Sequence, residues 1–146
     1  MKTGTQGKPS CEYQVRWTDR IYRLHKTGIA NHAPQGAGVF EIVLFPPGAS
    51  DGEVIFVGFE PQGGSVAERL RLAFEGFGGL NVAQLKELQE HLADAYFDAV
   101  SVSNATSDAD LMDLAWAVAQ EKKPRLNELS RQPHSGRFSE ITVKEV

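Results

Sequence analysis

The amino-acid sequence predicts an α/β fold, with a small, mainly antiparallel three-stranded sheet flanked by helices and an extra strand near the N-terminus. Residues 39–45 and 54–57 are two apolar runs separated by a loop rich in proline and glycine, which is the pattern of a β-hairpin. A third run rich in β-forming residues, 96–102, supplies the third strand. Between and after these strands, apolar residues recur at helical spacing, which predicts the flanking helices.

A single domain accounts for nearly the whole chain. Its 146 residues are 41% hydrophobic, which suffices for one core of ordinary size. Residues 1–10 are polar and rich in glycine and lysine, so we expect a mobile tail there and one domain over residues 11–146. The lone Cys11 cannot form an internal disulfide, which favours a reducing, cytoplasmic location. No apolar stretch is long enough to span a bilayer, so no membrane partner is expected.

The elements before the hairpin are a strand and an irregular segment. Tyr13, Val15 and Trp17 alternate with polar residues, which predicts the extra half-buried strand. Between residues 21 and 34 the apolar residues are irregularly spaced. A short helix or a turn is therefore expected just before the hairpin.

Two helices are expected between the hairpin and the third strand. Ser65 stands three residues before Glu68, the spacing of a capping box, and opens a helix that continues to about residue 76. A second helix begins after Asn81 and buries leucines at positions 85, 88 and 92. His91 has no companion at the spacing of a metal site, so we interpret it as a surface or structural residue.

A last helix and a short edge strand complete the predicted fold. Ser107 and Asp110 form a second capping box at the start of a helix over residues 108–121, which Pro124 ends. The apolar stripe of this helix consists of Leu111, Leu114, Ala115 and Val118. Alternating apolar residues at positions 141 and 143 allow a short edge strand near the C-terminus.

The charge balance limits which partners the chain can bind. A formal net charge of -4 and a pI near 5.5 exclude a protein whose whole surface is built for nucleic acid, because that affinity rests on lysine and arginine. The charge is uneven, however, since residues 1–35 and 121–146 have an excess of cations and residues 36–120 an excess of acids. Two interpretations stay open: the acids form solvated helix faces, or the basic ends fold together into a modest basic patch.

Short motifs in the hairpin and after the last helix carry a family resemblance. Residues 38–40 are GVF, residues 56–58 are FVG, and the helix that follows contains Arg69. The last helix is followed by Pro124, and an asparagine stands three residues later. This ordered combination resembles the GIY-YIG nuclease superfamily over residues 34–129. The resemblance implies a small antiparallel sheet of the GIY-YIG type with helices packed on it.

The resemblance also implies where the family's chemical groups would lie. The two motif tyrosines fall on Phe40 and Phe56, the phosphate-binding arginine on Arg69, the metal-binding glutamate on Ala115 and the asparagine of the PxxN ending on Asn127. A phenyl ring cannot donate, accept or lose a proton, and alanine cannot bind a metal ion. Loss of general acid–base catalysis alone costs about 10² to 10⁴ in rate. We therefore assign no catalytic residue, no metal site and no cofactor.

The expected function is that of a catalytically inactive domain that binds a partner, with DNA or RNA bound weakly as the leading candidate. The cations expected to contact nucleic acid are Arg69, Arg71, Lys122, Lys123 and Arg125. One alternative is an active metal-dependent DNA endonuclease, in which Tyr96 or Asp113 replaces the lost groups and Mg²⁺ is required. Another alternative is a protein-interaction or structural module whose working surface is the acidic second helix.

Overall fold

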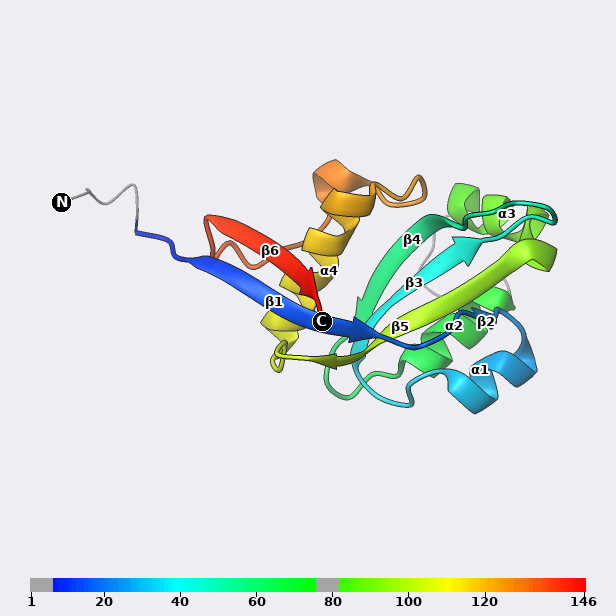
Figure 1. Ribbon diagram of the computed structural model, residues 1–146, viewed down its shortest axis with the longest axis horizontal. Helices are drawn as coiled ribbons and strands as arrows, with labels where there is room; N and C mark the ends of the chain where they lie inside the picture. The colour runs from blue at the N-terminus through cyan, green and yellow to red at the C-terminus, as the bar shows by residue number, and fades with distance from the viewer. Residues whose placement is uncertain (1–6, 76–81) are drawn as a thin grey trace.

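The computed structural model of the chain describes residues 7–75 and 82–146, which form an α/β domain (Figure 1). Within them, one mixed sheet has the order β4-β3-β5-β1-β6, and β2 pairs with β5. The strands are β1 (Ser10–Trp17), β2 (Tyr22–Arg23), β3 (Gly38–Leu44), β4 (Glu53–Glu60), β5 (Ala95–Ser103) and β6 (Glu140–Glu145). The helices are α1 (Lys26–His32), α2 (Val66–Phe74), α3 (Val82–Glu90) and α4 (Asp108–Lys122), with short 3₁₀ helices η2 (Leu92–Asp94) and η3 (Leu129–Arg131). None of the described helices has the length and apolar character needed to cross a bilayer.

The predicted hairpin and third strand form the centre of the sheet. β3 pairs antiparallel with β4 on one side and with β5 on the other. Six of the seven residues of β3 are buried, so both faces of this strand are covered. The prediction of an α/β fold with an antiparallel centre is therefore confirmed.

The sheet is nevertheless larger than three strands, because the predicted N-terminal strand and the short edge strand allowed at positions 141 and 143 both join it, as β1 and β6. β1 adds antiparallel to β5, and β6 lies parallel to β1 with Cys11 opposite Ile141. The two-residue strand β2 also pairs with β5. Parallel pairing between the two ends of a chain depends on contacts more than a hundred residues apart, which no local pattern reveals. The prediction of a three-stranded sheet is therefore wrong in its extent.

The pairing of β1 with β6 also shortens the predicted N-terminal tail. Residues 1–6 lie outside the described residues, but Ser10 already belongs to β1. The carbonyl of Pro9 accepts a hydrogen bond from the Ser139 amide at 2.9 Å. In Figure 1, β1 and β6 extend to one side of the body formed by β3, β4 and β5. Residue 10, the last residue of the segment expected to form the tail, thus belongs to the sheet.

Two hydrophobic cores lie on opposite faces of the central strand. Phe40 and Ile42 face the core shared with α1, α2 and α3, which includes Leu70 and Leu88. The preceding Val39 faces the core shared with α4, together with Tyr13, Val57, Leu114 and Ala115. Alternation along β3 therefore assigns each side chain to one core or the other.

Side-chain caps determine where helices α2 and α4 begin. Ser107 Oγ accepts from the Asp110 amide at 3.1 Å, and the Asp110 carboxylate accepts from the Ser107 amide at 3.2 Å, which confirms the capping box of α4. At α2 only half of the predicted box forms, because Ser65 caps the helix while the Glu68 carboxylate bonds to Arg71. The predicted cap Asn81 lies outside the described residues. α3 ends at Glu90, so position 92 falls in η2 rather than in the predicted second helix.

Gly58 allows two aromatic rings to pack against the central hairpin. It lies opposite Phe40 across the β3–β4 pair, and the Phe40 and Phe56 ring centroids are 6.1 Å apart. A Cβ atom at position 58 would lie 2.7 Å from Phe40 Cζ and 2.9 Å from Phe56 Cε2. Both distances are far below van der Waals contact, so any side chain here would displace a buried ring. The FVG triplet is explained by this close packing.

We predict that Gly58→Ala lowers the free energy of unfolding by about 1–3 kcal/mol, because overpacking a tight core displaces its side chains. Urea denaturation followed by circular dichroism measures the change. Gly36→Ala is the matched control, since a Cβ atom there would meet nothing within 4 Å. An equal loss of stability in both variants would contradict the packing role of Gly58.

Candidate binding site

A pocket of about 410 Å³ lies beside the outer edge of β4. Residues 56–59 of β4 form one wall, and Arg69 of α2 and Gln84 of α3 contribute to a second. The segment that follows α4 supplies the remaining lining, between residues 127 and 133. Four separate parts of the chain therefore meet at this pocket.

The pocket brings together most of the residues to which the resemblance assigned a site. Phe56, Arg69 and Asn127 line it directly. Phe40 is fully buried behind them, with its ring centroid 5.9 Å from the Arg69 guanidinium carbon. Ala115 does not join them, because it is fully buried in the core between α4 and the opposite face of the sheet. A carboxylate at position 115 would therefore lie inside the second core rather than beside Arg69.

Arg69 is held in place at the pocket by an acid and a ring. Its Nη1 atom lies 2.9 Å from the Glu60 carboxylate, and both side chains are about one-fifth exposed. The guanidinium also lies over the Phe40 ring, an arrangement that favours a cation. Because arginine has five N–H donors and Glu60 receives one bond, the remaining donors can bind an anion that enters the pocket.

Asn127 has a structural role that the sequence did not reveal. Its Oδ1 accepts from the Val57 amide at 2.9 Å, and its Nδ2 donates to the Val57 carbonyl at 2.8 Å. The neighbouring Leu126 amide donates to the Ile55 carbonyl at 2.9 Å. The segment after α4 therefore binds the free edge of β4 as a further strand would, and protects it from pairing with other chains.

Sequence reasoning missed Arg131, the second arginine of the pocket. It lies in η3, within a segment that the sequence indicated only as a loop, and its side chain is 83% exposed. Its contact with Glu128 is long, with 3.8 Å between nitrogen and oxygen. A single basic residue in a loop gives no sequence signal for a site, because its proximity to β4 depends on how the segment after α4 folds back.

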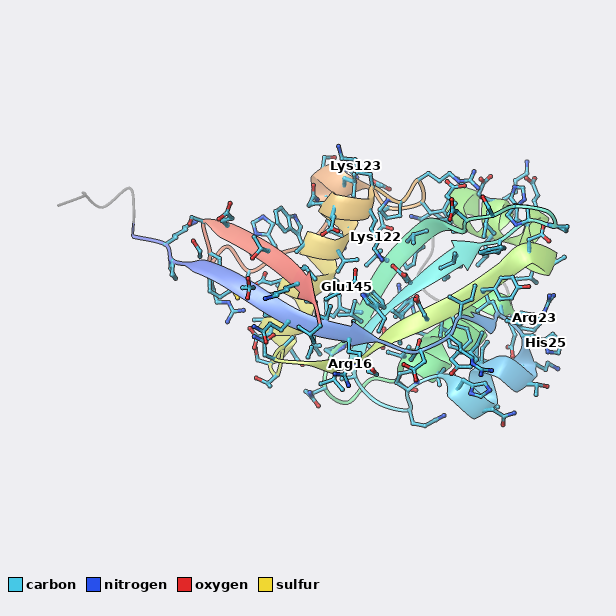
Figure 2. All side chains as sticks on the ribbon, in the orientation of Figure 1. Arg16, Arg23, His25, Lys122, Lys123 and Glu145 are labelled. Atoms are coloured by element: carbon cyan, nitrogen blue, oxygen red, sulfur yellow. The ribbon has the colours of Figure 1, made fainter. Side chains whose placement is uncertain are left out.

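The five predicted nucleic-acid-binding cations do not form one unpaired basic surface. Arg71 pairs with Glu68 and Glu75 on its own helix, and Arg125 pairs with Glu53 and Glu87. Figure 2 shows Lys122 and Lys123 at the C-terminal end of α4, where Lys123 is exposed at the helix cap. Local carboxylates thus neutralise most of the charge that the sequence predicted for DNA or RNA.

Lys122 instead interacts with a buried acidic pair that lies between β3, β5 and α4. Its Nζ atom lies 2.9 Å from the carboxylate of Glu41, a residue only 4% exposed, and 4.6 Å from the centre of the Trp17 ring. Asp98 faces Glu41 across the β3–β5 pair. Burial and the neighbouring Glu41 carboxylate raise the pKa of Asp98 to about 8. The neutral carboxyl can then donate a hydrogen bond to Glu41.

The groups considered for relocated catalysis lie elsewhere in the structure. Tyr96 is on β5, where its hydroxyl accepts from Arg23 at 3.4 Å. Asp113 is fully buried and accepts hydrogen bonds from Ser135 at 2.6 Å and Arg137 at 2.9 Å. Burial opposes ionisation of Asp113, but these bonds outweigh it and lower its pKa. Neither Tyr96 nor Asp113 lines the pocket beside Arg69.

His91 is less isolated than the sequence indicated. One ligand atom each from Glu87, Glu90 and His91 lies within 4.8 Å of the others. Residues at i, i+3 and i+4 share one helix face, which is the sequence signal for this grouping. Glu87 is already bonded to Arg125, so a cation bound here would compete with that ion pair.

We predict that Asn127→Ala lowers the free energy of unfolding by about 1–3 kcal/mol, because it leaves the amide and carbonyl of the buried Val57 without partners. Thermal and urea denaturation measure the loss. Asn31→Ala, at an exposed position of α1, is the control and should leave stability within about 0.5 kcal/mol. Unchanged stability of the Asn127 variant would contradict its structural role.

We also predict that stability falls as pH rises between about 4 and 8, because folded Asp98 retains a proton that an ordinary aspartate has lost. One proton contributes a slope of at most about 1.4 kcal/mol per pH unit. Urea midpoints at several pH values should show this slope in the native chain and a flatter profile in Asp98→Asn. An unchanged slope in that variant would contradict the assignment.

Comparison of the chain with protein-family models, with curated proteins and with solved structures finds no match. The geometry of the pocket and the charges around it are therefore the basis for any function assigned to the chain. The most direct evidence for a function is the set of contacts that Arg69, Phe56 and Asn127 make at this pocket.

Proposed function

We propose that this chain is a non-catalytic domain with a GIY-YIG-like scaffold, which binds a nucleic-acid strand in the pocket beside β4. The observation that carries the proposal is the meeting of Phe56, Arg69 and Asn127 around one pocket, with Phe40 directly behind them. These residues come from three separate motifs of the resemblance. Their meeting in space is what a shared ancestral site would produce.

The arrangement of elements supports the scaffold part of the proposal. An antiparallel hairpin is followed by two helices, a third strand and a last helix, and the third strand pairs with the first strand of the hairpin. The segment that begins at Pro124 then returns to the hairpin through Asn127. β1, β2 and β6 are additions at the side of this core.

The chemistry of the pocket supports the non-catalytic part. Phe40 and Phe56 have no oxygen to activate water, and Ala115 has no carboxylate for a metal ion. Among the described residues that line the pocket, Glu128 is the one acid, and it lies beside Arg131. Phe40, Phe56 and Ala115 therefore supply neither a general base nor a metal ligand at the positions to which the resemblance assigns the catalytic groups.

The same pocket suits a phosphate group and an adjoining base. Arg69 and Arg131 can donate hydrogen bonds to phosphate oxygens, and Phe56 and Phe59 contribute aromatic surface to the wall. Glu60 and Glu128 reduce the net charge, so the affinity should be low and strongly dependent on salt.

A combined binding and cleavage assay tests the proposal. Single-stranded, duplex and branched DNA and single-stranded RNA are titrated by fluorescence anisotropy, and parallel samples are incubated with Mg²⁺ or Mn²⁺ and run on a gel. We predict salt-dependent binding without cleavage. Arg69→Ala should weaken binding by about tenfold or more, the value of one charge-assisted contact. Arg71→Ala, a neighbour on α2 outside the pocket, should change it less than twofold.

Other outcomes would favour a different function. Cleavage that is lost in Arg69→Ala would support the metal-dependent endonuclease with relocated groups. Absence of any salt-dependent binding would favour a protein-interaction module, in which α3 and its acids Glu87 and Glu90 form the contact surface. Equal effects of Arg69→Ala and Arg71→Ala would indicate that nucleic acid is attracted by the overall positive charge of α2 rather than bound in the pocket.

A further inference from the structure

We propose that a second pocket, formed by β2, α1 and β5, binds a nucleobase together with its phosphate. The pocket has a volume of about 480 Å³, and the residues that define it are Arg20, Tyr22, Arg23, His32 and Tyr96. It shares no lining residue with the pocket beside β4, so it stands independently of the function proposed above.

The charge of this pocket is not neutralised by acids. The sequence has no aspartate or glutamate from residue 20 to residue 40, and none lines the pocket. Arg23 instead donates to neutral oxygens, the Ala93 carbonyl at 2.9 Å and the Tyr96 hydroxyl at 3.4 Å. Within the described residues, neither Arg20 nor Arg23 forms an ion pair with a carboxylate. This differs from the pocket beside β4, where both arginines have acidic partners.

Aromatic rings in the pocket are arranged for stacking. Tyr22 and His32 are stacked, with ring centroids 3.9 Å apart and planes within 8° of parallel. Tyr22 also packs against the buried Phe97, whereas His32 is exposed. The stack is therefore supported by the core on one side and open to solvent at His32. A planar base can extend such a stack, as bases do on aromatic side chains of single-strand-binding proteins.

The backbone holds these groups in fixed positions. Tyr22 and Arg23 pair with Phe97 and Tyr96 on β5, which places Arg23 beside the Tyr96 ring at 5.5 Å. A Cβ atom at Gly28 would lie 2.4 Å from the Arg23 carbonyl oxygen, so only glycine lets α1 sit this close to β2. Figure 2 shows Arg23 and His25 beside α1, well separated from Lys122 and Lys123. The pairing with β5 and the close contact at Gly28 thus fix the backbone of β2 against α1.

Two cations beside an open aromatic stack match a base and its phosphate better than they match an anion alone. The arginines supply donors for phosphate oxygens, and the rings supply the stacking surface. A free nucleotide and a single-stranded nucleic acid share this chemistry. A base inside a duplex does not, because its faces are already stacked.

The test is a fluorescence-anisotropy titration with a fluorescein-labelled ten-nucleotide dT strand, in competition with AMP, unlabelled dT strand or duplex of equal length. We expect Arg20→Ala and His32→Ala each to weaken strand binding about fivefold or more. Arg20→Ala should also reduce the salt slope by about 0.7, the share of one phosphate contact on a single strand. Arg16→Ala, an exposed arginine of β1 outside the pocket, is the matched control and should have little effect.

The variants separate this site from the pocket beside β4. Loss of affinity in Arg20→Ala and His32→Ala but not in Arg69→Ala would support this site and overturn the other. The reverse pattern, or equal effects of Arg20→Ala and Arg16→Ala, would overturn this proposal. Competition by AMP would identify a nucleotide site, and competition by the dT strand alone a single-strand site. Duplex that competes as well as single strand would contradict stacking of an open base.

Discussion

The burial of β3 on both faces is the constraint on which the rest of the structure depends. β3 must pair with β4 and β5 along its length and must direct alternate side chains into two separate cores. Phe40 therefore meets Phe56 across Gly58, which leaves room for no side chain at that point. The same alternation brings Glu41 into the opposite core, where Lys122 from α4 must compensate its charge.

This packing also determines what the pocket beside β4 contains. The GVF triplet places the Phe40 ring behind Arg69, where it supports the guanidinium but supplies no oxygen. The side-chain amide of Asn127 bonds to the edge of β4, so an asparagine at this position has a structural role that requires no catalytic activity. The contacts of Gly58 and Asn127 hold the scaffold together without any group that would cleave a substrate.

Local features of the fold could be predicted from the sequence, and long-range ones could not. The hairpin, the cap at Ser107 and the stripe of α4 depend on neighbours a few residues apart, so their spacing reveals them. β6 depends on a parallel partner at the other end of the chain, and Arg131 enters the pocket only because its segment folds back onto β4. The pairing of Arg125 with Glu53 could not be predicted for a similar reason, since the two residues are distant in sequence.

The central claim is that the pocket beside β4 binds a nucleic-acid strand without cleaving it. A ¹H–¹⁵N correlation spectrum of the labelled chain, titrated with a short single-stranded oligonucleotide in the presence of Mg²⁺, tests it most directly. We expect progressive shifts of the amides of Phe56, Gly58 and Arg69 while the oligonucleotide stays intact. Unchanged chemical shifts of these three amides at saturating oligonucleotide, or the appearance of cleavage products, would contradict binding without cleavage at this pocket.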